Sequence, residues 1–153
     1  APAGGTLLDL YCGVGAMGIA LSGGFERVVG IELHEAATAT ARRNAEASGV
    51  RGEWHAGKVE EILPRLSWDG PATILVDPPR AGLHPKAAAF LARQRAECLL
   101  YVACNPASLA RDRVVLEEGG WRMTDLWTVD IFPQTPHVEA VGKFVMEGGH
   151  EAC

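Results

Sequence analysis

Short apolar runs of strand length alternate with segments of helical period along most of this sequence. The strand-like runs lie at residues 6–11, 27–32, 53–55, 72–80 and 98–104. The segments with helical character lie at residues 16–22, 34–48, 59–66, 85–95 and 108–119. This alternation predicts an α/β domain whose doubly wound parallel sheet has helices on both faces.

The last part of the chain departs from this alternation. Strand-like runs at 121–132 and 139–146 are separated only by "PQTPHV", which is far too short for a crossover helix. Two strands joined by so short a link pair antiparallel. The runs together therefore predict a mostly parallel seven-stranded sheet with an antiparallel last strand.

The composition is ordinary for a globular domain. Of the 153 residues 48% are apolar and 22% are charged, and the length suits one domain over residues 1–153. No apolar run is long enough to cross a membrane, and no basic region precedes the first apolar run. We therefore expect a cytoplasmic protein without a membrane anchor or a signal peptide.

The formal net charge of −5 bears on possible partners. A nucleic-acid-binding protein normally carries a basic surface that replaces counterions on phosphate groups. If this chain acts on nucleic acid, some of the affinity must come from a local cluster of arginines or from a part of the protein outside this sequence.

The cysteines argue against a structural metal site. Four are present: Cys12, Cys98, Cys104 and Cys153. They form no CxxC pair and have no histidine at zinc-finger spacing, so we expect reduced thiols and no bound metal. The spacing His137-x-Glu139 is also found in zinc deaminases, but the P-C-x-x-C that those enzymes need downstream is missing here.

A glycine-rich loop, "CGVGAMG", follows the first strand. Gly13, Gly15 and Gly18 have GxGxxG spacing, and Glu32 ends the next strand where a ribose-binding acid is expected. A nicotinamide or flavin enzyme fits this pattern. Asp9 favours S-adenosylmethionine instead, because a carboxylate repels a pyrophosphate but attracts an ammonium and a sulfonium. The alternatives are a loop that is only a tight connection, and a Glu32 that is only a solvated strand end.

The segment "DPPRAG" places Asp77 at the carboxyl end of a buried strand, where open α/β sheets bind their ligands. Pro78 and Pro79 restrict the backbone after it. The alternative is an aspartate that only forms a turn or caps a helix. Amino-group methyltransferases have an aromatic residue after the prolines, whereas this chain has Arg80, which indicates a different target atom.

Two further residues belong to the same edge of the predicted sheet. Cys104 ends the strand after that of Asp77, and backbone N–H groups at the following helix start favour a reactive thiolate. Packing as a small buried residue is the commoner role of a lone cysteine. Because the last strand is expected to be antiparallel, its first residue, Glu139, should also lie at this edge.

Four segments together resemble the catalytic domain of the RNA uracil-5-methyltransferases, which form 5-methyluridine in tRNA and in large-subunit ribosomal RNA. They are "DLYCGVGAMGIAL", "DPPRAGL", "LLYVACNPASLARD" and "DIFPQTPHVE". The resemblance implies the Rossmann-like fold of class I S-adenosylmethionine-dependent methyltransferases. It also implies methyl transfer to carbon 5 of a uridine through a covalent cysteine adduct at carbon 6. Departures are mild, with Ala16, Ala103 and Ser108 where the family commonly has other residues.

The resemblance also implies roles for single residues. Cys104 is the expected nucleophile, and Glu139 is the candidate base that removes the proton from carbon 5. Asp77 is expected to hold the amino acid end of the cofactor or the uracil edge, and Glu32 the ribose hydroxyls. Tyr11, Gly13 and Gly15 are expected around the methionine portion, and Asp9 keeps the cofactor-binding role that its charge indicates.

Members of this family carry an N-terminal half, often with a small RNA-binding β-barrel, that this sequence lacks. The resemblance therefore implies a catalytic domain that needs the missing half to hold its tRNA or ribosomal RNA substrate. Two alternatives stay open: a fragment that binds cofactor but cannot turn over, and an NAD-dependent oxidoreductase built on the same glycine loop.

Overall fold

The structure, a computed structural model, describes residues 4–68, 70–130 and 138–146. Its strands are β1 (Thr6–Leu10), β2 (Arg27–Glu32), β3 (Gly52–Ala56), β4 (Ala72–Val76), β5 (Cys98–Ala103), β6 (Trp121–Val129) and β7 (Glu139–Met146). Its helices are α1 (Ala16–Leu21), α2 (Glu35–Ala47), α3 (Val59–Ile62), α4 (Pro85–Leu91) and α5 (Pro106–Glu118), with the short 3₁₀ helices η1 (Ser22–Gly24) and η2 (Leu63–Arg65). Every strand and helix expected from the sequence is present, with ends that differ by a few residues.

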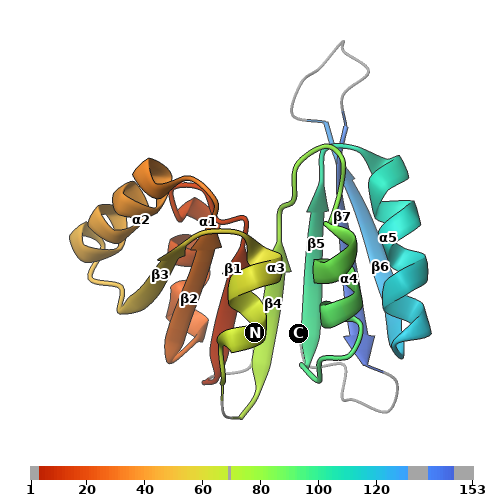
Figure 1. The fold of residues 1–153 in the computed structure, drawn as a ribbon, viewed down its shortest axis with the longest axis horizontal. Helices are drawn as coiled ribbons and strands as arrows, with labels where there is room; N and C mark the ends of the chain where they lie inside the picture. The colour runs from red at the N-terminus through yellow and green to blue at the C-terminus, as the bar shows by residue number, and fades with distance from the viewer. Residues whose placement is uncertain (1–3, 69, 131–137, 147–153) are drawn as a thin grey trace.

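The strands form a seven-stranded sheet in the order β3-β2-β1-β4-β5-β7-β6. Strands β1 to β5 are paired parallel, and β7 lies between β5 and β6, antiparallel to both. Figure 1 draws β7 pointing opposite to β5. The predicted mostly parallel sheet with an antiparallel last strand is confirmed.

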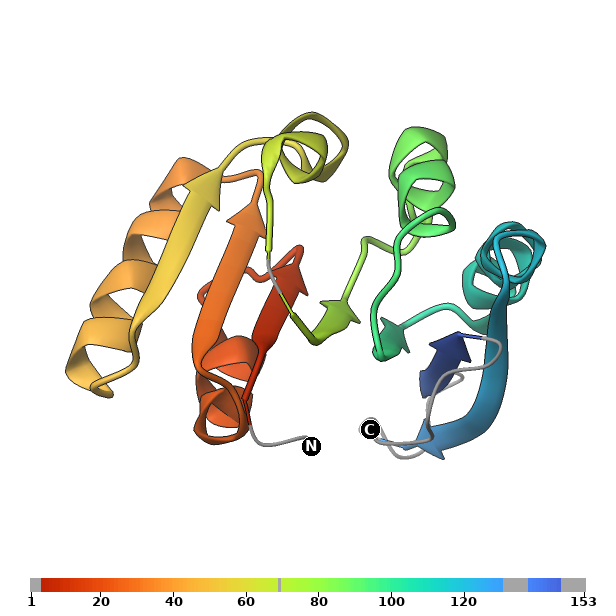
Figure 2. The ribbon, with the colours of Figure 1, turned by 90° about the horizontal axis from the view of Figure 1, so that it is seen from below.

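Helices cover both faces of the sheet, as expected. Figure 2 shows α3, α4 and α5 on one face and α1 and α2 on the other. The larger apolar core lies under α3 to α5 and contains Tyr101, Trp121 and Phe144, and the smaller one lies under α1 and α2 around Trp54. Strands β1 and β4 are buried at every residue, which is typical of parallel strands that are covered on both sides.

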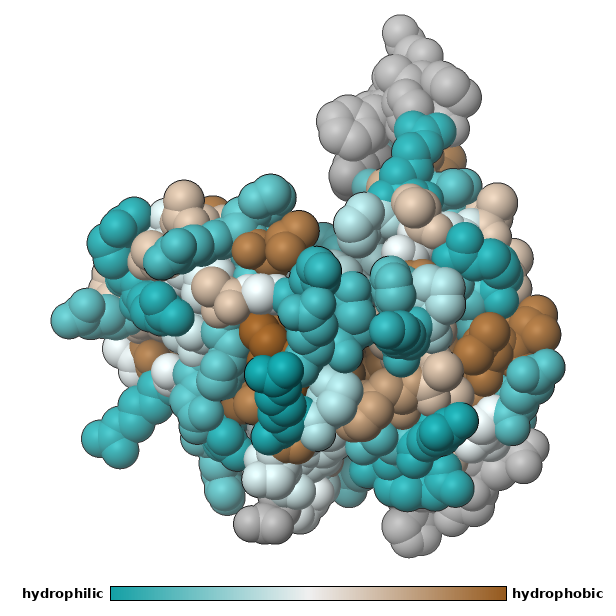
Figure 3. Space-filling model, viewed as in Figure 1, coloured by the Kyte–Doolittle hydropathy of each residue, from teal (hydrophilic) through white to brown (hydrophobic). Residues whose placement is uncertain are grey.

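Helix α5 begins two residues earlier than the sequence pattern indicates, because Asn105 and Pro106 start it. The Asn105 side chain accepts a hydrogen bond from the Ala107 N–H at 3.2 Å, and proline is well suited to the first helical turn. Helix α4 ends at Leu91, although the helical pattern continues to 95. Apolar side chains reach the surface over α5, where Val114 is 56% exposed (Figure 3).

The cysteines differ in their state. Cys12 and Cys104 are free, whereas Cys98 is disulfide-bonded, so the expectation of a reduced thiol is wrong for Cys98. Cys153 lies outside the described residues. In the part of the chain that the structure describes, no helix is long and apolar enough to span a membrane.

Candidate active site at the carboxyl edge of the sheet

Strands β4, β5 and β7 bring Asp77, Cys104 and Glu139 to one edge of the sheet. Asp77 directly follows β4, and Cys104 directly follows β5, which is the neighbour of β4 in the sheet. The ladder between β5 and β7 ends with the pair Ala103–Ala140. Cys104 and Glu139 are therefore the next residues along the two strands, which places the expected nucleophile beside the expected base. The Cys104 side chain is exposed and that of Glu139 is half-buried.

Asp77 is held at this edge by its backbone, whose N–H donates to the Leu10 carbonyl at 3.2 Å. Its pKa is raised, mainly because the carboxyl group is partly buried and further because the Glu139 carboxylate lies near. Two carboxyl groups, one after β4 and one at the start of β7, thus lie near each other at this edge of the sheet. Such a site favours a cation.

Asn105 connects the turn of Cys104 to the turn of Asp77. Its Oδ1 accepts from the Ala107 N–H, while its Nδ2 donates to the Arg80 carbonyl at 3.2 Å. One side chain therefore both caps the helix that follows the cysteine and holds the "DPPR" turn. The sequence pattern indicated neither the cap nor the second contact, which joins residues 25 positions apart.

The glycine loop is joined to the end of β2 by Glu32. Its Oε2 accepts from the Gly13 N–H at 3.0 Å and its Oε1 from the His34 N–H at 2.9 Å. A carboxylate offers about four acceptor positions, so both oxygens can accept further bonds from a ligand. Gly15 has a φ of +80°, and a Cβ there would lie 3.0 Å from the Trp54 ring.

A cavity of about 570 Å³ opens between these loops, and we call it the cofactor cavity. Three predicted site residues line it: Tyr11, Glu32 and Asp77. The remaining lining comes from the turns after β2, β3 and β4: Leu33, His34, Gly57, Lys58, Val59, Glu60, Pro78 and Pro79. The sequence analysis missed the turn after β3, because no motif marks it. The rule that ligands bind at the carboxyl ends of strands would have found it.

Asp9 lies behind this cavity rather than in its lining. It is fully buried, and its Oδ2 accepts from the Gly18 N–H at 3.0 Å. Burial raises its pKa to about 6; the bond from Gly18 opposes this rise and the nearby Asp77 adds to it. The carboxyl group therefore fixes α1 against β1, and any effect on a ligand acts through its charge. Gly13 and Gly15 also shape the loop without lining the cavity.

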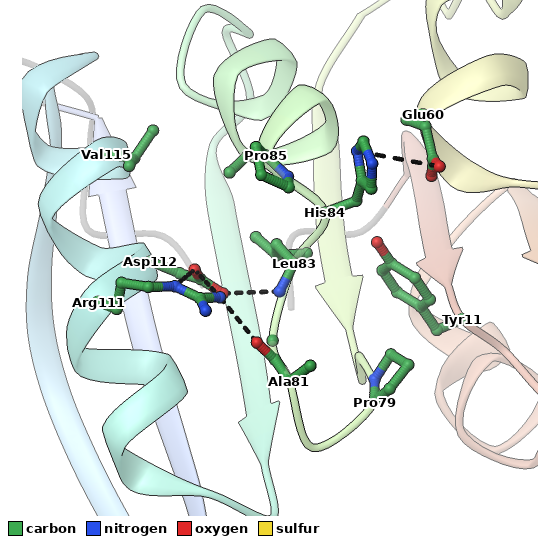
Figure 4. Close-up of a pocket in the computed structure, with 12 residues that line it drawn as sticks. Tyr11, Glu60, Pro79, Ala81, Leu83, His84, Pro85, Arg111, Asp112 and Val115 are labelled. Carbon is green, nitrogen blue, oxygen red and sulfur yellow. Dashed lines mark hydrogen bonds and ion pairs between the residues drawn. The ribbon is translucent and has the colours of Figure 1, made fainter.

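Tyr11 has a left-handed backbone, with a φ of +64°. Strained backbone of this kind is typical of functional loops. Its hydroxyl is buried without a hydrogen-bond partner among the described residues, and burial raises the pKa of this group to about 12. Figure 4 shows the ring in the wall of a second cavity, with the hydroxyl on the side of Glu60 and His84. Tyr11 thus separates two cavities.

This second cavity, the side cavity, also measures about 570 Å³. It lies between the turn after β4, the start of α4 and the middle of α5 (Figure 4). Its polar lining includes Arg111 and Asp112, which no motif in the sequence analysis singled out for a role. Among the described residues, no cluster of three or more His, Cys, Asp or Glu could hold a metal ion.

Comparison with known proteins gives this site a context. The family model described as tRNA (Uracil-5-)-methyltransferase matches residues 65–146, and one described as Conserved hypothetical protein 95 matches residues 2–100. A tRNA (uracil(54)-C(5))-methyltransferase of Pyrococcus abyssi is 41% identical over 93% of this chain and 33% of its own length. An uncharacterized RNA methyltransferase of Enterococcus faecalis is 41% identical over 88% of this chain and 30% of its own length. The chain thus spans about a third of the length of these relatives.

Solved structures agree with this. The crystal structure of the Pyrococcus abyssi tRNA (uracil-54, C5)-methyltransferase in complex with S-adenosyl-L-homocysteine is 42% identical and has a TM-score of 0.80. The match covers 91% of this chain and 34% of the Pyrococcus abyssi chain. An rRNA methylase of Streptococcus thermophilus has a TM-score of 0.74 and is 12% identical. The match covers 95% of this chain and 88% of the methylase, and at this identity it shows a shared fold alone. The family model covers the stretch from β4 to β7 that carries Asp77, Cys104 and Glu139, and the chain therefore belongs to the tRNA (uracil-5-)-methyltransferase family.

Proposed function

We propose that residues 1–153 form the catalytic domain of an S-adenosylmethionine-dependent RNA methyltransferase that modifies carbon 5 of a uridine. One observation carries this proposal: the β5–β7 ladder ends just before Cys104 and Glu139, next to Asp77 and the cofactor cavity. A thiol, a base and an acidic cavity meet there. Family membership and the Pyrococcus abyssi relative support the choice of a uridine in RNA.

The cofactor cavity fits S-adenosylmethionine in size and charge. Its volume of about 570 Å³ lies in the usual range for small-molecule sites. Asp77 offers a carboxylate to a cationic group, and Glu32 has acceptor positions left for ribose hydroxyls. When bound, the cofactor supplies an electrophilic methyl group. Tyr11 closes the cavity toward the side cavity, and Asp9 adds negative charge from beneath.

Cys104 performs nucleophilic catalysis in this proposal. Its thiolate adds to carbon 6 of uracil, which turns the ring into an enolate whose carbon 5 is nucleophilic enough to accept the methyl group. Glu139 then removes the remaining proton from carbon 5, and the C–S bond breaks to release the thiolate and the methylated base. The proton ends on Glu139 and the electron pair of the C–S bond returns to sulfur.

The RNA substrate must present an unstacked uridine, since the face of the ring is hidden in a duplex. Because this domain has a net charge of −5, we infer that other parts of a longer protein help it to bind RNA. In the family, the N-terminal half is the part expected to do this. Both tRNA and large-subunit ribosomal RNA fit this proposal. Mapping 5-methyluridine in cells with and without the full-length protein identifies the target.

The Cys104→Ala variant of the full-length protein tests the mechanism. We expect it to lose methyl transfer and covalent trapping by an RNA that contains 5-fluorouridine, because no thiolate remains to attack carbon 6. Binding of S-adenosylhomocysteine should stay near normal, since Cys104 does not line the cofactor cavity. Denaturing electrophoresis shows the trapped adduct.

The matched control is Cys12→Ala, which removes a second thiol that is free among the described residues and should leave trapping intact. An adduct in the Cys104→Ala protein would rule out Cys104 as the nucleophile. Tighter equilibrium binding of NAD than of S-adenosylhomocysteine would instead favour the oxidoreductase alternative. Assaying residues 1–153 beside the full-length protein shows whether the domain turns over alone.

A further inference from the structure

A buried carboxylate on α5, Asp112, collects four hydrogen bonds from three different segments of the chain. It is only 2% exposed. Its Oδ2 accepts from the Tyr101 hydroxyl at 2.6 Å and from the Leu83 N–H at 2.7 Å. Its Oδ1 accepts from Nε and Nη2 of Arg111 at 2.9 and 2.7 Å. Figure 4 shows the bonds from Leu83 and Arg111 beside the side cavity.

The turn after β4 is the segment that these bonds hold. Arg111 Nη2 donates to the Ala81 carbonyl at 2.8 Å, while Asp112 binds the Leu83 N–H. Between these two contacts Gly82 has a φ of +84°, and a Cβ there would lie 2.5 Å from Arg111 Nη2 and 2.6 Å from Asp112 Oδ2. The backbone thus approaches the pair so closely that only glycine fits. We call Tyr101, Arg111 and Asp112 the Asp112 network.

This network joins the two turns that carry the site. The turn at 78–83 starts directly after Asp77, and α5 starts two residues after Cys104. Asn105 makes a second link at the surface, but that bond is neutral and solvent-exposed. The bonds to Asp112 from the Leu83 N–H and the Tyr101 hydroxyl are charge-assisted and buried, so they fix the geometry more firmly.

Fold stability alone does not account for a buried carboxylate, because apolar residues of similar volume commonly stabilise a core as well or better. A fully bonded buried network instead selects one arrangement of the segments that it joins. Here the selected arrangement is that of the 78–83 turn against the helix that follows Cys104.

We propose that Asp112 is a positioning residue for methyl transfer: by fixing the 78–83 turn to α5, it sets the position of Asp77, and of the groups bound beside it, relative to Cys104. The proposal rests on the proposed function of Cys104. Asp112 does not itself line the cofactor cavity, so its loss should affect the approach of thiolate and base more than cofactor affinity.

The test is Asp112→Asn in the full-length protein. Asparagine keeps the shape but loses the charge and one acceptor oxygen, so the bonds to Leu83, Tyr101 and Arg111 cannot all be kept. We expect the rate of adduct formation with 5-fluorouridine RNA, and kcat, to fall about 100-fold, the effect of displacing a reacting group by about 1 Å. The KM for RNA and the affinity for S-adenosylhomocysteine should change less than about threefold.

Two further variants control for folding. Tyr101→Phe keeps the buried ring and removes only the hydroxyl, so it should give a smaller loss of the same kind, about tenfold in kcat. Glu118→Gln makes the same carboxylate-to-amide change at an exposed position of the same helix and should match the wild type. If Asp112→Asn does not fold, the Tyr101→Phe result decides.

Two results would overturn the proposal: adduct formation at the wild-type rate, or equal losses in adduct rate and S-adenosylhomocysteine affinity, which indicate general damage. A wild-type protein that binds S-adenosylhomocysteine but forms no adduct would instead refute the proposed function, and the role of Asp112 with it. The wild-type measurement thus separates the two failures.

Discussion

At Asp9 the fold keeps a carboxyl group out of reach of water. Its pKa is raised from 3.8 to about 6 by burial, so the folded protein binds this proton more tightly than the unfolded chain. The folded state therefore loses stability as pH rises from about 4 to about 6, and ionised Asp9 costs about 3 kcal/mol above that range. Carboxyl groups whose pKa is raised by burial are often found at ligand-binding sites.

The Asp9→Asn variant should change both the stability of the fold and the affinity for the cofactor. Its free energy of unfolding should exceed that of the wild type by about 2 kcal/mol at about pH 7.5 and match it near pH 4, because only the ionised form carries the penalty. Its affinity for S-adenosylmethionine should fall. Thermal unfolding at the two pH values measures the first effect and calorimetry the second; an equal stability difference at both pH values would contradict the prediction.

Replacing Glu139 should impair a later step of the proposed reaction than replacing Cys104. Glu139→Gln removes the proposed base but leaves the proposed nucleophile, so under this mechanism the methyl group can still be transferred while the proton on carbon 5 stays in place. We expect a methylated enzyme–RNA adduct to accumulate and turnover to fall by about 100-fold or more. Mass spectrometry of the protein after reaction detects the adduct. Turnover at the normal rate would remove Glu139 as the base.

At the scale of elements, the glycine loop combines two constraints that a pair of variants can separate. Gly15 and Gly49 both have positive φ, but a Cβ at Gly15 meets the Trp54 ring, whereas at Gly49 it meets nothing. Gly49→Ala should cost about 1 kcal/mol of unfolding free energy for the backbone alone. Gly15→Ala should cost about 1–3 kcal/mol more, because the core around Trp54 must shift. Equal costs in chemical denaturation would show that the ring moves aside freely.

The sequence predicted the elements well, because their signals are local. The strand limits at 27–32 and 139–146 match the structure. The resemblance to the RNA uracil-5-methyltransferases is confirmed by the family model. The parallel order alone placed Asp77 and Cys104 at one edge. Helix α4 was predicted too long, since residues after Leu91 have good helical propensity that the return to β5 overrides.

Other features of the site depend on contacts between distant residues and leave no local pattern. Asp9 was expected near the cationic groups of the ligand, and its bond from the Gly18 N–H was not foreseen. Asp112 and Leu83 are 29 positions apart, and nothing in either segment indicates their bond. Residues 131–137, which carry most of the "DIFPQTPHVE" segment and include His137, lie outside the described residues.

At the scale of the whole molecule, charge and length point the same way. The chain carries a net charge of −5 and spans about a third of its relatives. Under the proposed function, RNA binding should therefore depend strongly on segments that the relatives have outside the matched third, whereas cofactor binding should depend on them less, because the cofactor cavity is lined by residues of this domain.

The reversed strand β7 has a consequence for how the protein is made. Cys104 is synthesised before Glu139, and the two residues come together only when β7 pairs with β5. A slip of one residue in that ladder would turn Glu139 to the opposite face of the sheet. Pairing of β7 with β5 is thus the step that completes the proposed site, and a chain that ends before Glu139 would carry the proposed nucleophile without its base.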